Sequence, residues 1–242
     1  MSTEPRHMTI KGLSVGIVRK AIKNLHIGVY PPNGRVRVAA PTAMEDEAIR
    51  LAVIRKLGWI NRQRGKFEGQ ARQSQREMVD GESHYYQGRR YRIRVVEHNG
   101  PAKVEVRSNG FMIVHVRSGS TAEQREQGLL RWYRAKLKEI IPPLIEKWES
   151  VLGVSVTAWG VKKMKTKWGS CNTSAGRVWL NLELAKKPVE CLEYIVVHEM
   201  IHLLTRHHSP KFIALMDEHL PNWRFLRDRL NRAPLGHENW LY

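Results

Sequence analysis

The sequence has few cysteines and few acidic residues for its length. Two cysteines, Cys171 and Cys191, occur among 242 residues, and they form no C-x-x-C motif. This scarcity excludes a disulfide scaffold and argues against a redox pair or a thiolate zinc site. Asp and Glu together number 23 against 41 Lys and Arg, which gives a net charge of +18. Such an excess of positive charge favours a partner with negative charge.

Long apolar runs are also absent. No uninterrupted apolar stretch approaches the roughly 18 residues that span a membrane. The N-terminal residues include no apolar stretch after their charged ones, so they do not resemble a signal peptide. We therefore expect a cytoplasmic protein with no membrane partner. With 42% hydrophobic residues, the composition is that of a globular protein that buries a core without disulfides.

The first half of the chain is predicted to be rich in strands. A Pro-Pro-Asn-Gly turn at 31–34 joins two short alternating segments into a hairpin. Thr42 stands three residues before Glu45, a capping box that predicts a helix running to about residue 62. The polar segment 64–78 is expected to be a linker or a frayed extension of the helix. Further strands are predicted within residues 85–96, 104–106 and 111–116, with turns at Gln87-Gly88, Asn99-Gly100 and Asn109-Gly110.

The second half is predicted to alternate between helices and short strands. A capping box of Ser120 and Glu123 opens a long helix, which we expect to be kinked or split at Pro142 and Pro143. Strands follow over 154–166 and 178–182, and then helices that begin near residues 188, 209 and 221. The sequence thus predicts an α+β protein with a strand-rich basic region at 1–118 and a second domain at 119–242.

An H-E-x-x-H sequence, His198 to His202, lies inside the most clearly predicted helix of the chain. Residues four apart share one face of a helix, so the two imidazoles can reach one metal ion. Glu199 is turned about 100° from His198 because a helix has 3.6 residues per turn. This places its carboxylate beside the metal, where it can act as the general base that takes a proton from the attacking water.

A catalytic zinc site needs a third protein ligand and an open fourth position. His208 follows His202 by six residues, and Ser209-Pro210 then begins a new helix that would hold its imidazole in place. His207 is a rival because it is adjacent. Glu218, or another downstream acid, is a second alternative, since some zincins use a carboxylate as the third ligand.

Four segments together resemble a known family: MKTKWGSC at 164–171, VWLNL at 178–182, YIVVHEMIH at 194–202 and HSPKF at 208–212. They resemble the YgjP-like family of metal-dependent hydrolases and are similar to the wider SprT-like zincins. The resemblance implies a zincin-like domain in which the H-E-x-x-H helix packs on a small sheet. It also implies Zn²⁺ bound by His198, His202 and His208, with Glu199 as the catalytic residue, and a protein or peptide as the substrate.

Two other functions stay open at this stage. The water activation fits hydrolysis of a non-peptide bond equally well, and a fully ligated structural metal would suit a nucleic-acid-binding protein. In zincins the strand before the metal helix lines the cleft, so residues 178–182 are expected to pair with an extended substrate. Tyr194, Arg206 and His207 are candidates to stabilise an oxyanion. In the segment Trp168–Cys171 we expect a core tryptophan and a buried thiol in preference to a nucleophile.

Basic residues recur at every second position of three predicted strands. Alternation places them on one face of each strand, where they could follow the phosphate backbone of DNA or RNA. Solvent-exposed outer faces account for the same pattern. The residues concerned are Lys163, Lys165 and Lys167, then Arg90, Arg92 and Arg94, and finally Arg35 with Arg37.

Overall fold

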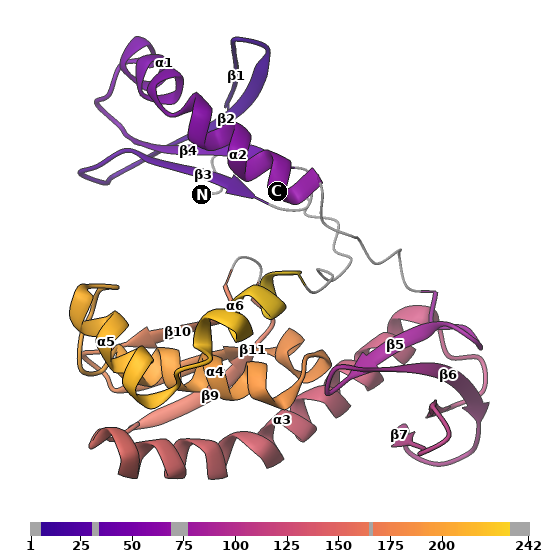
Figure 1. The fold of residues 1–242 in the computed structure, drawn as a ribbon. Helices are drawn as coiled ribbons and strands as arrows, with labels where there is room; N and C mark the ends of the chain where they lie inside the picture. Colours follow the sequence, from indigo (N-terminus) through magenta and orange to yellow (C-terminus); the bar gives the residue numbers. More distant parts are fainter. Residues whose placement is uncertain (1–5, 31–33, 69–76, 165–166, 233–242) are drawn as a thin grey trace. The chain divides into compact units, whose positions relative to one another are not determined.

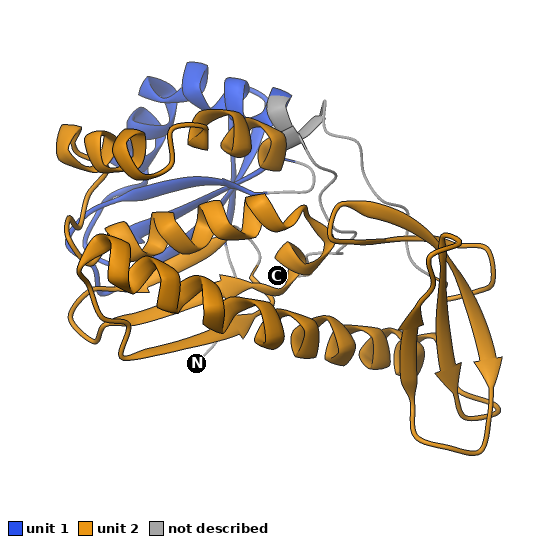
Figure 2. Cartoon of the chain, turned by 60° about the horizontal axis from the view of Figure 1, so that its bottom comes forward, with its two compact units in different colours: residues 1–73, 234–242 blue, residues 74–233 orange. Residues whose placement is uncertain are grey.

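The computed structural model describes residues 6–30, 34–68, 77–164 and 167–232. The chain forms two compact units, coloured separately in Figure 2, with the division between residues 73 and 74. The sequence placed its division between residues 118 and 119. The difference arises because the sheet formed by residues 83–116 shares one hydrophobic core with the long helix that follows it. The α+β class expected from the sequence is confirmed, with α-helices and mixed sheets in both described parts.

The first unit is a four-stranded sheet covered by two helices. Its strands are β1 (Arg6–Ile10), β2 (Leu13–Lys20), β3 (His26–Tyr30) and β4 (Arg35–Pro41), in the order β1-β2-β4-β3. The expected hairpin is the antiparallel pair β3 and β4, whose turn at 31–33 lies outside the described residues. β2 and β4 are parallel, and their alternate side chains are buried against the helices, as at Val15 and Val36. Each such apolar side chain contributes roughly 1.5–3 kcal/mol when fully buried.

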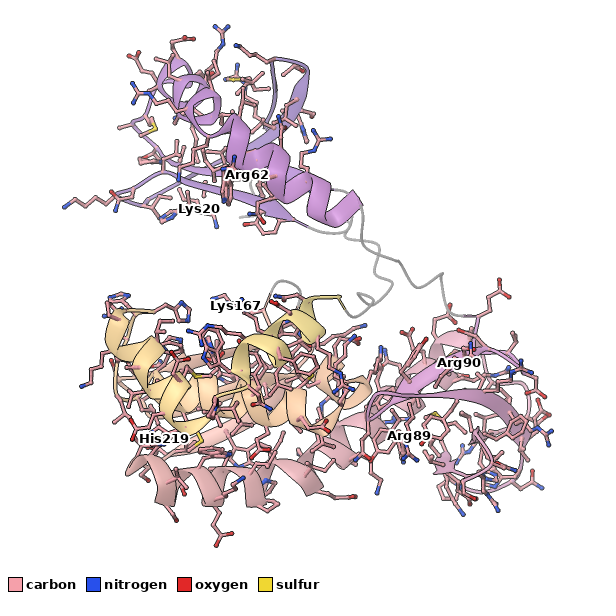
Figure 3. The ribbon with its side chains drawn as sticks, in the orientation of Figure 1. Lys20, Arg62, Arg89, Arg90, Lys167 and His219 are labelled. Carbon is pink, nitrogen blue, oxygen red and sulfur yellow. The ribbon has the colours of Figure 1, made fainter. Side chains whose placement is uncertain are left out.

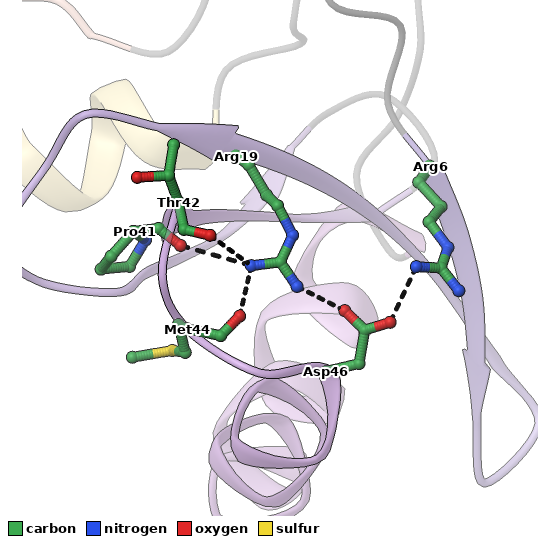
Figure 4. Close-up of polar contacts among 6 residues, drawn as sticks. All are labelled: Arg6, Arg19, Pro41, Thr42, Met44 and Asp46. Carbon is green, nitrogen blue, oxygen red and sulfur yellow. Dashed lines mark hydrogen bonds and ion pairs between the residues drawn. The ribbon is translucent and has the colours of Figure 1, made fainter.

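The single helix expected over 42–62 is two helices, α1 (Asp46–Arg55) and α2 (Leu57–Glu68). The predicted capping box is wrong, because Glu45 is the N-cap of α1 and its side chain makes no cap hydrogen bond. Asp46 in the first turn of α1 instead accepts hydrogen bonds from Arg6 at 2.8 Å and Arg19 at 2.6 Å (Figure 4). Arg19 also donates to the carbonyl groups of residues 41, 42 and 44. This arginine therefore fixes the start of α1 on the sheet.

The second unit begins with another four-stranded sheet. Its strands are β5 (Ser83–Tyr86), β6 (Arg89–Glu97), β7 (Lys103–Val106) and β8 (Phe111–Val116), in the order β5-β6-β8-β7. The strands predicted in this stretch are confirmed. Ile93 and Met112 are fully buried towards the helix that follows, whereas Arg90, Arg92 and Arg94 are exposed on β6. The predicted shared basic face of this strand is therefore confirmed.

The helix α3 (Ala122–Leu152) runs unbroken from this sheet to the next one, as Figure 1 shows. Its capping box is shifted by one residue from the prediction, since Thr121 and Gln124 form it. The expected break at Pro142 and Pro143 does not occur. Both prolines are exposed, and so are Lys138 and Glu139, whose carbonyl groups lose their helical partners and face solvent.

The third sheet and the remaining helices form the part of the second unit that holds the H-E-x-x-H sequence. The sheet order is β10-β11-β9, with β9 (Ala158–Lys162), β10 (Gly169–Asn172) and β11 (Arg177–Asn181). A 3₁₀ helix, η1 (Leu182–Lys186), leads into α4 (Val189–Ile201), which α5 (Pro210–His219) and α6 (Trp223–Arg232) follow. In the described residues, no helix is long and apolar enough to cross a bilayer.

The structure does not support the basic strand face predicted at Lys163, Lys165 and Lys167, as far as these residues are described. The strand β9 ends at Lys162. Both Lys163 and Lys167 lie outside any strand, and Lys165 lies outside the described residues. Chain alternation therefore does not align these lysines. Lys167 lies apart from Arg89 and Arg90, which Figure 3 labels on the β5–β8 sheet.

Candidate metal centre

The helix α4 carries apolar side chains on almost every side, and other elements of the unit cover almost all of them. It contacts α3, α5, α6, β10 and β11, and nine of its residues are buried, including Leu192, Val196 and Met200. A helix that is hydrophobic all round is typical of a protein core. The H-E-x-x-H sequence occupies its last turn, and His202 is the C-cap. A rigid, central element therefore positions the candidate site.

Three imidazoles converge at the end of this helix. His198, His202 and His208 each offer a ring nitrogen, and these atoms all lie within 4.8 Å of one another. The Nε2 atoms of His198 and His208 are 3.0 Å apart. Two ligands of a tetrahedral zinc at about 2.0–2.1 Å lie roughly 3.3 Å apart, so the arrangement fits one metal ion. Among the described residues, neither His207 nor Glu218 belongs to this cluster.

The loop after α4 brings the third histidine into place. The backbone carbonyl of Thr205 lies 3.1 Å from Nδ1 of His202, so this nitrogen can carry the proton and donate to it. That tautomer leaves the lone pair of Nε2 facing the cluster, as in many metal sites. Ser209 is the N-cap of α5, where its Oγ accepts a hydrogen bond from the backbone N–H of Phe212. The predicted start of this helix after His208 is confirmed.

A single aromatic side chain packs against all three imidazoles. The ring of Phe212, which is 1% exposed, has its centroid 4.9 Å from those of His198 and His202 and 4.6 Å from that of His208. The rings therefore rest on a common wall. Phe212 belongs to the HSPKF segment that carries part of the family resemblance, but the sequence did not predict that its ring packs against the imidazoles.

Burial favours the neutral form of His198 and His202. The pKa of His198 is lowered to about 3, chiefly by burial and further by the neighbouring His202 and His208. Burial also lowers the pKa of His202. A metal ligand must present a neutral imidazole. The protonation state that metal binding requires is therefore the one that these two side chains already hold at neutral pH.

The carboxylate of Glu199 lies between α4 and β10. The residue is 6% exposed, and burial raises the pKa of its side chain to about 7, while the nearby Lys167 ammonium opposes that rise. A general base works best when its pKa lies close to the pH of operation. A raised pKa of this kind is compatible with a general base, and that role of Glu199 stays a prediction of the sequence.

The histidines and Glu199 open onto a cleft of about 810 Å³. Its opposite wall is β10 and the turn after it, which the sequence did not predict as a wall. Tyr194, Arg206 and His207, the three candidates for oxyanion stabilisation, all line this cleft. Burial raises the pKa of Tyr194 to about 12, so its hydroxyl stays a hydrogen-bond donor. The remaining lining residues are 167–174, Ile195, His198, Glu199, His202 and His208.

Burial disfavours the nucleophilic thiolate form of both cysteines. Cys171 is half-buried in the cleft wall, and burial, with a contribution from Glu199, raises its pKa to about 11. Cys191 is fully buried in the core, and burial raises its pKa as well. Because the thiolate is the nucleophilic form, both groups are unreactive at neutral pH.

The strand expected to pair with substrate is a central strand. β11 is bonded to β10 on one side and to β9 on the other, so it has no free edge. The expectation for residues 178–182 is therefore wrong. β10 and β9 are the two edge strands of this sheet, and β10 is the one whose residues line the cleft.

Comparison with known proteins identifies the family. The model of the YgjP-like metallopeptidase domain matches residues 23–233, and no curated protein matches the chain. The crystal structure of the metallopeptidase zymogen of Pyrococcus abyssi abylysin is similar at 22% identity over 36% of this chain and 89% of that chain. Its TM-score of 0.34 is too low to inform the site. The match over most of the chain shows that this protein belongs to the YgjP-like family of metal-dependent peptidases.

Proposed function

We propose that this protein is a zinc peptidase whose metal is held by His198, His202 and His208 and whose general base is Glu199. The observation that carries the proposal is the convergence of three imidazoles beside a buried carboxylate at an open cleft. Three neutral nitrogen ligands with an open fourth position are typical of catalytic zinc. A structural zinc would have a fourth protein ligand, and the described residues offer none in this cluster.

The chain's own residues divide the chemistry among them. His198, His202 and His208 would hold a divalent metal, which would supply Lewis-acid chemistry to the attacking water and the scissile carbonyl. Glu199 accepts the proton of that water at a carboxylate oxygen and passes it to the amine nitrogen that leaves. Phe212 and the Thr205 carbonyl hold the imidazole rings in their orientations. The fixed rings keep the reacting groups aligned.

The free edge of β10 is where an extended peptide would bind. Its residues Gly169–Asn172 line the cleft. One side of the strand is bonded to β11, and no strand among the described residues pairs with the other side. Backbone groups on an open edge pair with an added strand. Substrate binding by strand addition therefore belongs to β10 in this proposal.

The charges of the cleft favour acidic substrates. Its lining includes the exposed side chains of Lys167 and Arg206, whereas Glu199 is its one carboxylate among the described residues. A positive cleft attracts negative side chains and rejects positive ones. We expect peptides with Asp or Glu near the cleaved bond to be better substrates than the same peptides with Lys.

Charge reversal at Arg206 tests this preference. In Arg206→Glu, the ratio of kcat/KM for an Asp peptide over its Lys counterpart should fall by about tenfold, equivalent to ~1.4 kcal/mol, at low salt. Lys167 is unsuitable for this test because it lies close to Glu199. The matched control is Arg90→Glu, because Arg90 is exposed on β6 and does not line the cleft. An unchanged ratio in the Arg206 variant would show that this charge does not select substrate.

Hydrolysis of a non-peptide bond is the alternative reaction. Turnover of casein, measured against a panel of esters and nucleotides with the same metal-loaded protein, separates the two. Cleavage of casein alone supports the proposal, and turnover of the panel without casein cleavage rejects it. A cytoplasmic location and contact with DNA or RNA stay predictions of the sequence. For the latter, binding of a labelled duplex across a salt series is the test.

A further inference from the structure

Gly169, the first residue of β10, lies directly against the side chain of Glu199. A Cβ atom added to this glycine would lie 2.6 Å from Oε1, 2.7 Å from Cγ and 2.9 Å from Cδ of Glu199. Ordinary contacts between such atoms are about 3.5–4.0 Å. The carboxylate of Glu199 therefore occupies the space that any other residue at position 169 would fill.

The backbone conformation of Gly169 gives no other reason for a glycine. Eight described glycines have a positive φ, the conformation that favours glycine, and Gly169 is not one of them. The residue lies in a paired strand, opposite Leu180 of β11. Glycine weakens a strand and often marks a close approach by another group. Here the approaching group is the Glu199 carboxyl.

The strand is held so that it cannot retreat from Glu199. The backbone N–H of Asn181 donates to the carbonyl of Trp168 at 2.9 Å, and the Asn181 side chain donates to the carbonyl of Lys167 at 2.7 Å. The same amide donates to the carbonyl of Met164 at 2.9 Å. The segment before Gly169 is thus anchored to β11. A side chain at 169 would have to displace the flexible carboxylate.

We propose that Gly169 is a positioning residue for the reaction: the absence of a side chain there forms the seat of the Glu199 carboxylate. The inference rests on the proposed function, in which Glu199 is the general base. A methyl group at this position moves the carboxylate away from the attacking water without touching a metal ligand. Misplacement of a catalytic group by about 1 Å can cost roughly 100-fold in rate.

Gly169→Ala tests the proposal with the metal-loaded, full-length protein. We expect kcat for a peptide substrate to fall by about 100-fold, with KM and the metal content per chain unchanged. Gly128→Ala is the matched control, because Gly128 lies in α3 and its added Cβ would meet only Ala102, at 4.0 Å. Wild-type kcat is expected in that variant. A role of β10 in substrate binding alone would raise KM and leave kcat unchanged.

The outcomes separate this inference from the proposed function. If Gly169→Ala keeps wild-type kcat while Glu199→Gln is inactive, the positioning role of Gly169 is rejected and the general-base role of Glu199 is retained. If Glu199→Gln also retains full activity, the proposed function itself fails. Should Gly169→Ala fold poorly, its melting temperature is compared with that of the double variant with Glu199→Ala. Strain against the carboxylate predicts that the double variant melts like Glu199→Ala alone, and a double variant as unstable as Gly169→Ala overturns the seat.

Discussion

Replacing Glu199 by Gln should slow peptide hydrolysis by orders of magnitude while the metal stays bound. The substitution keeps the shape of the side chain and removes its basic oxygen, and the three imidazoles are untouched. Loss of a general acid–base group costs about 10²–10⁴-fold in rate. We expect kcat to fall by that factor with one metal per chain retained, measured by peptide cleavage and metal analysis on the same sample.

Two controls accompany this variant. Glu190→Gln changes an exposed carboxylate in the first turn of the same helix, and its kcat should equal that of the wild type.

The second control is the stability of the metal-free protein. Because the pKa of Glu199 is raised to about 7, the folded state holds the proton of this carboxyl more tightly than the unfolded state does. Stability therefore falls as pH rises from about 4.5 to 7. Above pH 7 the metal-free Glu199→Gln variant should have a higher melting temperature than the metal-free wild type. Full peptidase activity of Glu199→Gln would exclude Glu199 as the general base.

His208→Ala should remove the metal from the site. Two ligands four residues apart on a helix bind zinc weakly, and the third closes the tetrahedral set. Loss of a hydrogen-bond partner of a ligand already costs about 10–100-fold in metal affinity, so loss of the ligand itself should cost more. We expect metal-free protein after dialysis and no detectable peptide hydrolysis, with far-UV circular dichroism unchanged.

His207→Ala is the matched control for the third ligand. His207 is the neighbouring residue, is exposed and lies outside the cluster of possible ligands. This variant should retain one metal per chain after the same dialysis. If His207→Ala loses the metal and His208→Ala retains it, His207 is the third ligand and the assignment of His208 is wrong.

The sequence was sufficient for the part of the site that is local in the chain. The spacing of His198, Glu199 and His202 follows from helical geometry alone, and Ser209-Pro210 indicates where the next helix begins. His208 was therefore within reach of a prediction that needed no tertiary contact. The structure brings the three histidines together as that prediction expected.

The wall of the cleft could not be predicted because it depends on contacts between distant residues. Gly169 and Glu199 are 30 residues apart, and no periodicity connects them. β10 reads Gly-Ser-Cys-Asn, a sequence without the β-branched and aromatic residues that mark strands. It becomes a strand because its residues pair with those of β11. Because β10 was not predicted as a strand, the sequence analysis assigned substrate binding to residues 178–182, which belong mainly to the central strand β11.

Local signals also failed where tertiary packing overrode them. Pro142 and Pro143 normally end a helix, yet α3 continues because Leu137, Ile141 and Ile145 keep one face buried in the core. The lysines from 163 to 167 alternate as a strand would, but β9 ends before them. Alternation over so few residues indicates a strand only when a neighbouring strand pairs with it.

The most direct test of the account is reactivation of the metal-free protein by zinc. Protein stripped with a chelator should not cleave casein, and stepwise addition of Zn²⁺ should restore cleavage in proportion until one equivalent per chain is bound. Glu199→Gln should bind the same single equivalent and gain no activity. Full casein cleavage by the stripped protein in excess chelator, or activity that continues to rise well past one equivalent, would contradict a single catalytic metal at the three histidines.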